Sequence, residues 1–216
     1  MTSLTPQLLL GAYASGIFPM AESRHDADLY WIDPDMRGVL PLDAFHIPRR
    51  LRKTIRTSPF EIRCDSDFVG TVRSCAEPQG NRPETWINDE IEHLYSALFD
   101  MGFAHSVECW HDGAMVGGLY GVSLGGAFFG ESMFSRARDA SKVALCHLVA
   151  RLLKSGFVLL DSQFVTDHLR QFGAAEIERA DYKKRLAAAL KVDADFQPEL
   201  SDDAFEAFIQ STTQTS

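Results

Sequence analysis

The sequence predicts an α+β fold around a mostly antiparallel sheet, with a small α/β lobe at the N-terminal end. Strand-like alternation broken by tight glycine turns marks a three-strand meander over residues 106–135. Apolar residues at helical spacing precede this meander at 89–101 and follow it at 140–155, before a last apolar strand at 157–162. Helices and an antiparallel meander in this order are typical of an α+β architecture.

Local start and stop signals predict the remaining elements. Thr5-Pro6 begins a helix that Gly16 ends, and Asn88 is a good N-cap for the helix at 89–101. Further helices are expected at 48–57, 67–75, 167–172 and 180–190, and a further strand at 60–64. A loop over residues 77–84, rich in Gly, Pro and Asn, predicts a small N-terminal lobe over 1–80 and a main domain over 81–216.

Length and composition limit the class of protein. The chain has 216 residues, 45% of them apolar and 24% charged, which is typical of a soluble globular protein. No run approaches the roughly 18 apolar residues of a membrane helix, and the start of the chain has no secretory pattern. The four cysteines have unrelated spacings. We therefore expect a cytoplasmic protein with reduced thiols and no bound metal.

The charge is acidic overall but basic at one place. The net charge of −9 argues against a protein coated with positive charge for nucleic acid. Residues 49–56 nevertheless contain five cations and no acid. On a helix, Arg49, Lys53 and Arg56 lie on one face because their spacings are four and three. This pattern favours contact with a polyanion, and a solvated helix face is the alternative.

Two carboxylates occur where apolar strands are expected. In a regular strand Glu131 shares a face with Phe129 and Met133, and an unpaired buried carboxylate is costly. Glu131 is therefore either functional or a structural residue paired with backbone amides, Lys142 or Arg136; the pattern leaves both open.

The second carboxylate, Asp161, ends an apolar strand, and Gln163 follows two residues later on the same face. Strand ends beside helix starts are places where functional sites are often built. The alternative is that Asp161 caps the following helix.

Several motifs occur together in one order. They are Gly16-Ile17-Phe18-Pro19, Trp31-x-x-Pro34-x-x-Arg37-Gly38, Thr85-Trp86-Ile87, Ala104-His105-Ser106-Val107-Glu108-x-Trp110, Val116-Gly117-Gly118-Leu119-Tyr120-Gly121-Val122, Gly130-Glu131-Ser132-Met133-Phe134-Ser135, Ala140-Ser141-Lys142 and Asp161-x-Gln163. Over residues 9 to 182 the chain resembles the bacterial leucyl/phenylalanyl-tRNA–protein transferases.

The resemblance implies a reaction. Such enzymes transfer leucine or phenylalanine, with methionine as a further candidate donor, from aminoacyl-tRNA to proteins with N-terminal Arg or Lys. The product is a degradation signal of the N-end rule pathway. No cofactor is implied, because the ester of the donor is already activated. The implied catalytic domain, residues 81–216, is of the N-acetyltransferase (acyl-CoA N-acyltransferase) type, and the N-terminal lobe is trimmed.

Two alternatives to this reaction belong to different functional classes. One is a CoA-dependent N-acetyltransferase, which would cradle a pyrophosphate in a glycine-containing turn. The turn at 136–140 has no glycine and contains an acid, which counts against CoA. The other alternative, a non-catalytic tRNA-binding module, leaves Asp161 and Gln163 unexplained.

The resemblance also implies roles by position. Asp161, Gln163 and Glu131 fall on catalytic positions: Asp161 would orient the amine or act as base through Gln163, and Glu131 would anchor the aminoacyl-adenosine or the acceptor amine. The implied substrate-binding residues are Tyr95, Trp86, Leu119, Phe128, Met133, Ser135, Leu145, Leu148, Leu152 and Leu160. The implied tRNA-binding residues are Arg49, Lys53 and Arg56. Met20 departs from the family pattern, because an aromatic residue often stands there to stack on the terminal adenosine.

Overall fold

A computed structural model describes residues 4–21, 23–24, 29–78, 85–196 and 199–212 of the chain. In this part, one sheet has the strand order β4-β5-β6-β7-β8-β3-β9, and β1 and β2 form a separate pair. The strands are β1 (Phe18–Met20), β2 (Tyr30–Ile32), β3 (Met36–Leu40), β4 (Glu61–Cys64), β5 (Ala104–His111), β6 (Ala114–Leu124), β7 (Ala127–Ser135), β8 (Leu159–Gln163) and β9 (Ala175–Glu178). Among the strands of the described residues, only β7 and β8 pair in parallel. The predicted mixed α+β class with a mostly antiparallel sheet is confirmed.

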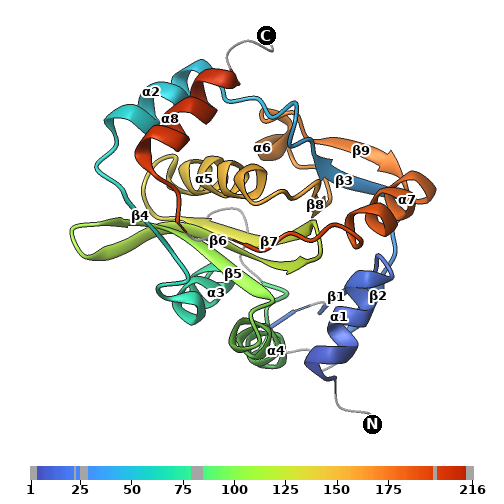
Figure 1. The fold of residues 1–216 in the computed structure, drawn as a ribbon. Coiled ribbons are helices and arrows are strands. Elements are labelled where there is room, and N and C mark those ends of the chain that lie inside the picture. The colour runs from blue at the N-terminus through green and yellow to red at the C-terminus, as the bar shows by residue number, and fades with distance from the viewer. Residues whose placement is uncertain (1–3, 22, 25–28, 79–84, 197–198, 213–216) are drawn as a thin grey trace.

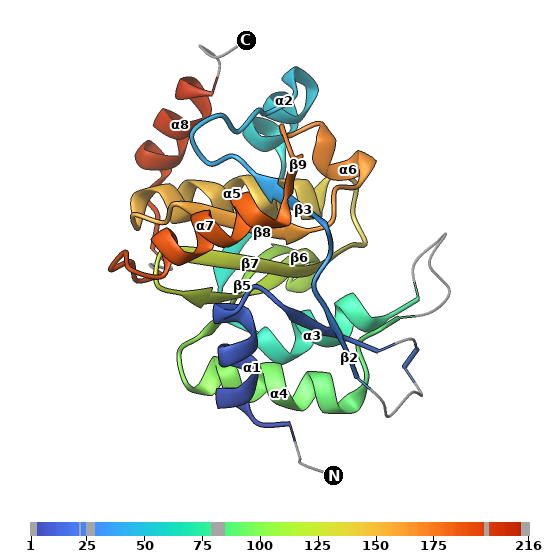
Figure 2. The same cartoon turned by 90° about the vertical axis from the view of Figure 1, so that its right-hand side faces the viewer.

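Helices cover both faces of the sheet (Figures 1 and 2). They are α1 (Pro6–Ala14), α2 (Arg49–Thr57), α3 (Phe68–Ala76), α4 (Asp89–Asp100), α5 (Ala140–Lys154), α6 (Asp167–Arg170), α7 (Arg179–Ala189) and α8 (Asp202–Ser211). Buried residues of α2, α5 and α8 form one apolar cluster, and those of α1, α3, α4 and α7 form another. The sheet therefore separates two cores, each closed by its own helices.

The best-marked local signals are confirmed. The Thr5 hydroxyl accepts a hydrogen bond from the Leu8 amide, and the Asn88 side chain accepts one from the Ile91 amide, so both predicted N-caps form. The meander appears as β5, β6 and β7, and α5 follows it. A Cβ on Gly117 would lie 2.5 Å from the Cβ of Ala140, so glycine at this position allows α5 to pack closely on β6.

Several elements have no counterpart in the sequence-based prediction. These are β1, β2, β3, β9 and α8. Strand β3 lies between β8 and β9, and β4 forms one edge of the sheet, so two strands that precede residue 80 share the sheet with those that follow it. The division at residue 80 stays a prediction, and residues 79–84 of the expected loop lie outside the described residues.

A bulge in β7 overturns the expected alternation around Glu131. Gly121 pairs with Gly130 and Tyr120 pairs with Ser132, so Glu131 is an extra residue with no partner on β6. Phe129 consequently lies in the core of α1, α3 and α4, whereas Met133 packs against the core of α5. The prediction that these two side chains share a face is wrong, because a single inserted residue reverses the alternation.

The parallel pair β7–β8 separates part-way along its length. The two strands are paired from Ala127 and Leu159 to Phe129 and Asp161, and no pairing follows. Beyond that point β7 continues to Ser135, while β8 stays paired with β3 as far as Gln163. The two strands thus carry Glu131 and Gln163 along opposite sides of an opening in the sheet.

Candidate active site

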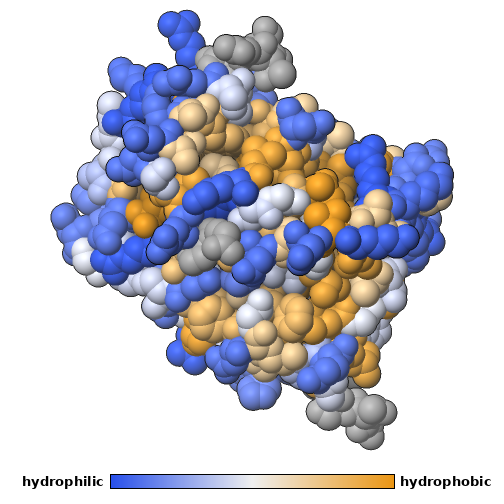
Figure 3. All heavy atoms as spheres, in the orientation of Figure 1, coloured by the Kyte–Doolittle hydropathy of each residue, from blue (hydrophilic) through white to orange (hydrophobic). Residues whose placement is uncertain are grey.

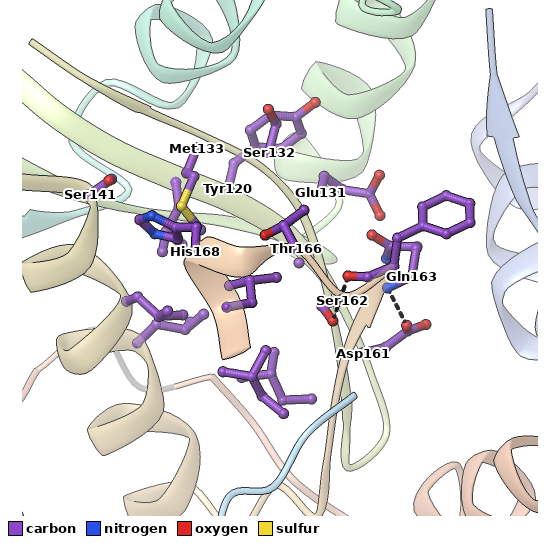
Figure 4. A pocket seen from close by; sticks show the side chains of 18 of the residues that line it. Tyr120, Glu131, Ser132, Met133, Ser141, Asp161, Ser162, Gln163, Thr166 and His168 are labelled. Atoms are coloured by element: carbon purple, nitrogen blue, oxygen red, sulfur yellow. Dashed lines mark hydrogen bonds between the residues drawn. The ribbon is translucent and has the colours of Figure 1, made fainter. Parts of the chain in front are cut away.

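A cavity of about 570 Å³ lies where β7 and β8 separate. Its apolar lining comes mainly from β6, β7, α5, β8 and α6, through Leu119, Met133, Leu145, Leu148, Leu160 and Leu169. Its polar lining includes Glu131, Asp161 and Gln163. Figure 4 shows these three residues toward one side of the cavity and Met133, Ser141 and His168 toward the other. A concave site with an apolar interior and a few convergent polar groups is typical of a small-ligand site.

Most of the predicted substrate-binding residues line this cavity. They are Trp86, Leu119, Met133, Ser135, Leu145, Leu148 and Leu160. Tyr95, Phe128 and Leu152 are fully buried and do not line it. The ring of Phe128 packs near those of Phe157 and Phe196 inside the core. These three residues lie behind the lining, and Tyr95 reaches the site through its hydrogen bond to Glu131, so their role in substrate binding stays a prediction.

Two buried tyrosines hold Glu131. The hydroxyl of Tyr13 donates to Glu131 Oε1 at 2.7 Å, and that of Tyr95 donates to Oε2 at 2.9 Å. The two hydroxyl oxygens also lie in contact with each other. The structural partners expected for Glu131 were backbone amides, Lys142 or Arg136, and in the described residues the tyrosines take their place. Burial raises the pKa of Glu131 to about 7, although the two tyrosine hydrogen bonds oppose that shift.

This pKa makes folding stability depend on pH in a defined direction. Between pH 4.5 and 7 the folded chain holds a proton on Glu131 that the unfolded chain has lost, so this carboxyl lowers the free energy of unfolding as pH rises. The free energy of unfolding of Glu131→Gln minus that of the wild type should therefore rise by about 2 kcal/mol as the pH is raised from 5 to 8. Thermal unfolding across that range measures the difference. Glu90→Gln, an exposed change on α4, is the control. A difference that does not vary with pH would contradict the prediction.

Asp161 is fully buried, and both of its carboxylate oxygens are occupied. Oδ1 accepts from Arg37 Nε at 2.9 Å and from the backbone N–H of Gln163 at 2.8 Å. Oδ2 accepts from Arg37 Nη2 at 2.6 Å and from the Tyr182 hydroxyl at 2.7 Å. The alternative prediction, that Asp161 caps the next helix, is wrong, because Thr166 stands at the N-cap of α6.

Gln163 faces the cavity in an uncommon backbone conformation. Its φ of +57° lies in the left-handed region, and its backbone N–H donates to the carboxylate of Asp161. Its side-chain Nε2 is buried without a hydrogen-bond partner among the described residues. An amide that lines a cavity with free donors can bind a polar atom of a ligand.

Sequence reasoning missed three residues that hold the polar wall of the cavity, which consists of Glu131, Asp161 and Gln163. Tyr13 holds Glu131, and Arg37 and Tyr182 hold Asp161. Arg37 carried a signal that could have been used, because it is a cation within the apolar segment Met36–Leu40. A cation in such a segment requires a buried anion nearby. Tyr13 and Tyr182 lie on apolar helix faces, and such a pattern is equally typical of residues that only pack in the core.

The basic helix α2 is exposed on one side, as predicted. Arg49, Lys53 and Arg56 are all exposed, and Figure 3 shows hydrophilic residues gathered over α2 and α8. Arg56 Nη2 pairs with Glu206 Oε1 of α8 at 2.7 Å. Arg52, another cation of this run, is buried and donates to backbone carbonyls, including that of Thr212 at 2.7 Å.

A second hollow adjoins the basic helix. It measures about 340 Å³ and is lined by Arg50, Lys53, Thr54, Thr57, Arg138 and Asp139. Asp139 also lines the large cavity, so the two hollows meet at the turn between β7 and α5. A surface that carries Arg50, Lys53 and Arg138 thus adjoins the large cavity at Asp139.

Comparison with known proteins decides the family. The sequence model described as leucyl/phenylalanyl-tRNA protein transferase matches residues 39–187, and the one described as its N-terminal domain matches residues 2–35. The chain belongs to this family. Glu131, Asp161 and Gln163 lie within the first match, and Phe18 and Met20, which also line the cavity, lie within the second.

Relatives in this family match the chain over nearly its whole length. A leucyl/phenylalanyl-tRNA–protein transferase of Paramagnetospirillum magneticum is 63% identical over 190 residues, which are 88% of this chain and 91% of that protein. One of Rhodospirillum rubrum is 59% identical over 202 residues, 94% of this chain and 95% of that protein. The solved structure of L-PGS from Bacillus licheniformis covers 83% of this chain and 64% of its own, with a TM-score of 0.40 and 10% identity. A structural similarity at that level carries no argument about the fold.

Two further findings concern metal binding and membrane insertion in the described residues of this family member. No group of three or more His, Cys, Asp or Glu side chains among them could hold a metal ion. None of their helices is long and apolar enough to cross a membrane.

Proposed function

We propose that the large cavity transfers leucine or phenylalanine from aminoacyl-tRNA to the α-amino group of proteins with N-terminal Arg or Lys. The single observation that supports this most is the combination, in one cavity, of an apolar lining and a polar wall with two carboxylates and an amide. The apolar part suits an uncharged amino-acid side chain, and the polar wall suits an ester and an amine. Membership of the family adds the identity of donor and acceptor, with methionine as a further donor.

The apolar lining determines which donor side chains fit. The aliphatic side chains of the lining include Leu145 and Leu148 of α5, Leu119 of β6, Met133 of β7 and Leu160 of β8. Each buried aliphatic or aromatic side chain gains about 1.5–3 kcal/mol from leaving water. Leucine, phenylalanine and methionine gain this energy, whereas branching at Cβ widens valine and isoleucine near the polar wall.

Aromatic side chains near the opening are proposed to hold the terminal adenosine. Trp86 and Phe164 line the cavity, and Phe164 is 45% exposed, whereas the ring of Phe18 is 3% exposed and is occupied by the Arg37 guanidinium. Stacking of a base on an aromatic ring gains about 1–3 kcal/mol. Met20 also lines the cavity, but its thioether has no π-face, so the neighbouring rings would carry the stacking.

The transfer forms one bond and breaks one. The α-amine nitrogen of the acceptor attacks the ester carbonyl carbon, and a tetrahedral oxyanion forms. The bond between that carbon and the ribose oxygen then breaks, so a peptide bond replaces the ester. The amine loses one proton and the ribose oxygen gains one, and the reaction is balanced without ATP or a metal ion.

Each polar residue has a proposed role in this reaction. The side-chain Nε2 of Gln163 has a free N–H to donate to the ester oxygen, and its Oε1 would accept a hydrogen bond from the amine. Asp161 orients Gln163 rather than acting as the base, because its two oxygens already accept hydrogen bonds from Arg37, Tyr182 and the backbone N–H of Gln163. Glu131 anchors the aminoacyl-adenosine or the acceptor amine. Holding amine and ester together supplies much of the rate acceleration.

The basic side of α2 is proposed to bind the tRNA. Arg49, Lys53 and Arg56 would contact phosphates, and the second hollow would carry the acceptor strand toward the cavity. Changing all three residues to alanine should weaken tRNA binding and lower the slope of log affinity against log salt by about 0.7 to 0.9 for each lost contact. Transfer from a minimal aminoacyl-adenosine, which lacks the tRNA body, should stay nearly unchanged.

The control for this prediction removes the same charge elsewhere. Lys184, Arg185 and Lys191 are exposed cations on α7 and just after it, and their change to alanine should leave the salt slope as in the wild type. Filter binding or fluorescence anisotropy from low to high salt measures both variants. If the α2 variant reduced transfer from both donors equally, Arg49, Lys53 and Arg56 would have a structural role and would not bind tRNA.

Two further parts of the proposal concern architecture and location. The domain of residues 81–216 is proposed to be of the N-acetyltransferase type, with residues 1–80 as the small lobe. The order of helix, three-strand antiparallel meander, helix and strand supports this assignment. Because charged tRNA is a cytoplasmic molecule, the proposed substrate places the protein in the cytoplasm.

One incubation tests the proposed function against its rivals. The protein is mixed with labelled Phe-tRNA or labelled acetyl-CoA, and with peptides that start with Arg, Lys or Ala. We expect phenylalanine on the Arg and Lys peptides, little on the Ala peptide, and no acetylation. Acetylated peptide would support the CoA-dependent acetyltransferase, and tRNA binding without transfer would support a non-catalytic module.

A further inference from the structure

A single arginine ties together two walls of the cavity. Arg37 lies on β3, and its guanidinium binds both carboxylate oxygens of Asp161 at the end of β8. Its Nη1 donates to the carbonyl of Gly16 at 3.0 Å. Gly16 precedes β1, and Phe18 of β1 lines the cavity. The position of one guanidinium therefore fixes the segment before β1 and the end of β8 relative to each other.

The surroundings allow that guanidinium little freedom. Arg37 is 1% exposed, and its guanidinium carbon lies 4.5 Å from the ring centres of both Phe18 and Tyr182. The Tyr182 hydroxyl donates to Asp161 Oδ2 at 2.7 Å. A lysine would keep the charge but lose the planar fork that binds a carboxylate with two parallel hydrogen bonds.

The cluster ends at Gln163. Asp161 Oδ1 accepts from the Gln163 amide at 2.8 Å, the contact drawn in Figure 4, and Gln163 has a φ of +57°. Such a conformation is costly outside glycine and persists only where the surroundings impose it. Opposite Gln163, a Cβ on Gly38 would lie 2.6 Å from the carbonyl carbon of Phe164, so the turn after β8 presses against β3.

We propose that Arg37 and Tyr182 are positioning residues for the transfer reaction, which act through Asp161 to present the Gln163 side chain to the reacting ester and amine. The inference rests on the proposed function and names residues that support it without touching substrate. In the described residues Arg37 and Tyr182 are absent from the lining of the cavity, so their effect passes through hydrogen bonds.

This role has a kinetic signature that a purely structural role lacks. The donor side chain is proposed to bind among the leucines of α5, β6 and β8. Arg37 does not line the cavity, and its hydrogen bonds go to Asp161 and Gly16. Loosening Gln163 should therefore lower kcat while the KM of the donor stays close to that of the wild type. A general loss of folded protein would instead lower the amount of active enzyme and the melting temperature together.

Two variants test the inference on the full chain. Arg37→Lys keeps the charge without the fork, and Tyr182→Phe keeps the ring over the guanidinium but removes one hydrogen bond. Single-turnover and steady-state transfer from phenylalanyl-adenosine to an Arg-starting peptide give kcat and KM, with thermal unfolding alongside. We expect kcat to fall about 100-fold for Arg37→Lys and about 3- to 10-fold for Tyr182→Phe, with donor KM within about 3-fold of the wild type.

Arg52→Lys is the matched control. Arg52 is also buried and also uses its guanidinium to bind backbone carbonyls, but it does so under α8, outside the lining of the cavity. This variant should lose thermal stability and keep its kcat with the minimal donor.

The outcomes separate the inference from the proposed function. An inactive wild-type protein would overturn the proposed function and this inference with it. An active wild type whose kcat is unchanged in folded Arg37→Lys and Tyr182→Phe would overturn the inference alone. The same holds if kcat falls no further than in Arg52→Lys. If Arg37→Lys does not fold, the kcat of Tyr182→Phe decides.

Discussion

Replacing Leu145 by aspartate is expected to abolish transfer, with kcat/KM lowered by about 1,000-fold or more. Leu145 lines the cavity from α5 and is only 3% exposed. A leucine or phenylalanine side chain that binds there would have to displace the water around the new carboxylate, and the desolvation of a carboxylate is costly. Loss of the apolar contact adds to the effect. Rates with leucyl-, phenylalanyl-, isoleucyl- and valyl-adenosine measure the prediction.

Two further variants separate this effect from unfolding. Leu153→Asp introduces the same charge on α5 at a site that is 41% exposed, and transfer should be unchanged. Leu145→Ala, the milder change, should fold and should lower kcat/KM for leucine about 10-fold. Equal rates for leucine, isoleucine and valine in the wild type would contradict the assignment of this pocket to the donor side chain.

Asp161→Asn is the second change with a large expected effect. It should lower turnover by about ten- to a thousand-fold, the range of one lost electrostatic contact in an active site. It should also lower the free energy of unfolding by about 3–5 kcal/mol, because it leaves the buried charge of Arg37 without its anion. The KM of the donor should change little. Single-turnover transfer of phenylalanine and chemical denaturation measure the two effects.

A capping aspartate provides the control for this change. Asp67 caps α3 by accepting from the Gly70 amide, and asparagine fills such a position nearly as well. Asp67→Asn should therefore leave turnover and stability close to the wild type. If Asp161→Asn behaved in the same way, Asp161 would have no part in the mechanism, and proximity would remain as the source of rate.

Local signals predicted the elements that carry the site. Glycine turns marked the β5–β7 meander, Asn88 marked the start of α4, and a clear helical stretch marked α5. Each of these patterns is determined within about ten residues, so sequence alone contains it. The same holds for the exposed face of α2, because helical spacing is enough to place its cations together.

The features that sequence reasoning missed depend on distant contacts. Asp161 is bound by Arg37, 124 positions earlier, and no local pattern contains that pairing. The bulge at Glu131 looks like ordinary strand until its partner strand is known. Phe128 and Leu152 have the same apolar character as true lining residues, and only packing shows that they face the core. Sequence therefore predicted the residue types of the site better than their contacts.

A crystal structure with an amide-linked phenylalanyl-adenosine, which cannot transfer its amino acid, tests the central claim most directly. The account predicts the phenyl ring among Leu145, Leu148 and Leu160, and the carbonyl within hydrogen-bond distance of the Gln163 side chain. It also predicts the adenine against an aromatic ring at the opening. A phenyl ring outside the apolar cavity, or a carbonyl remote from Gln163, would contradict the account.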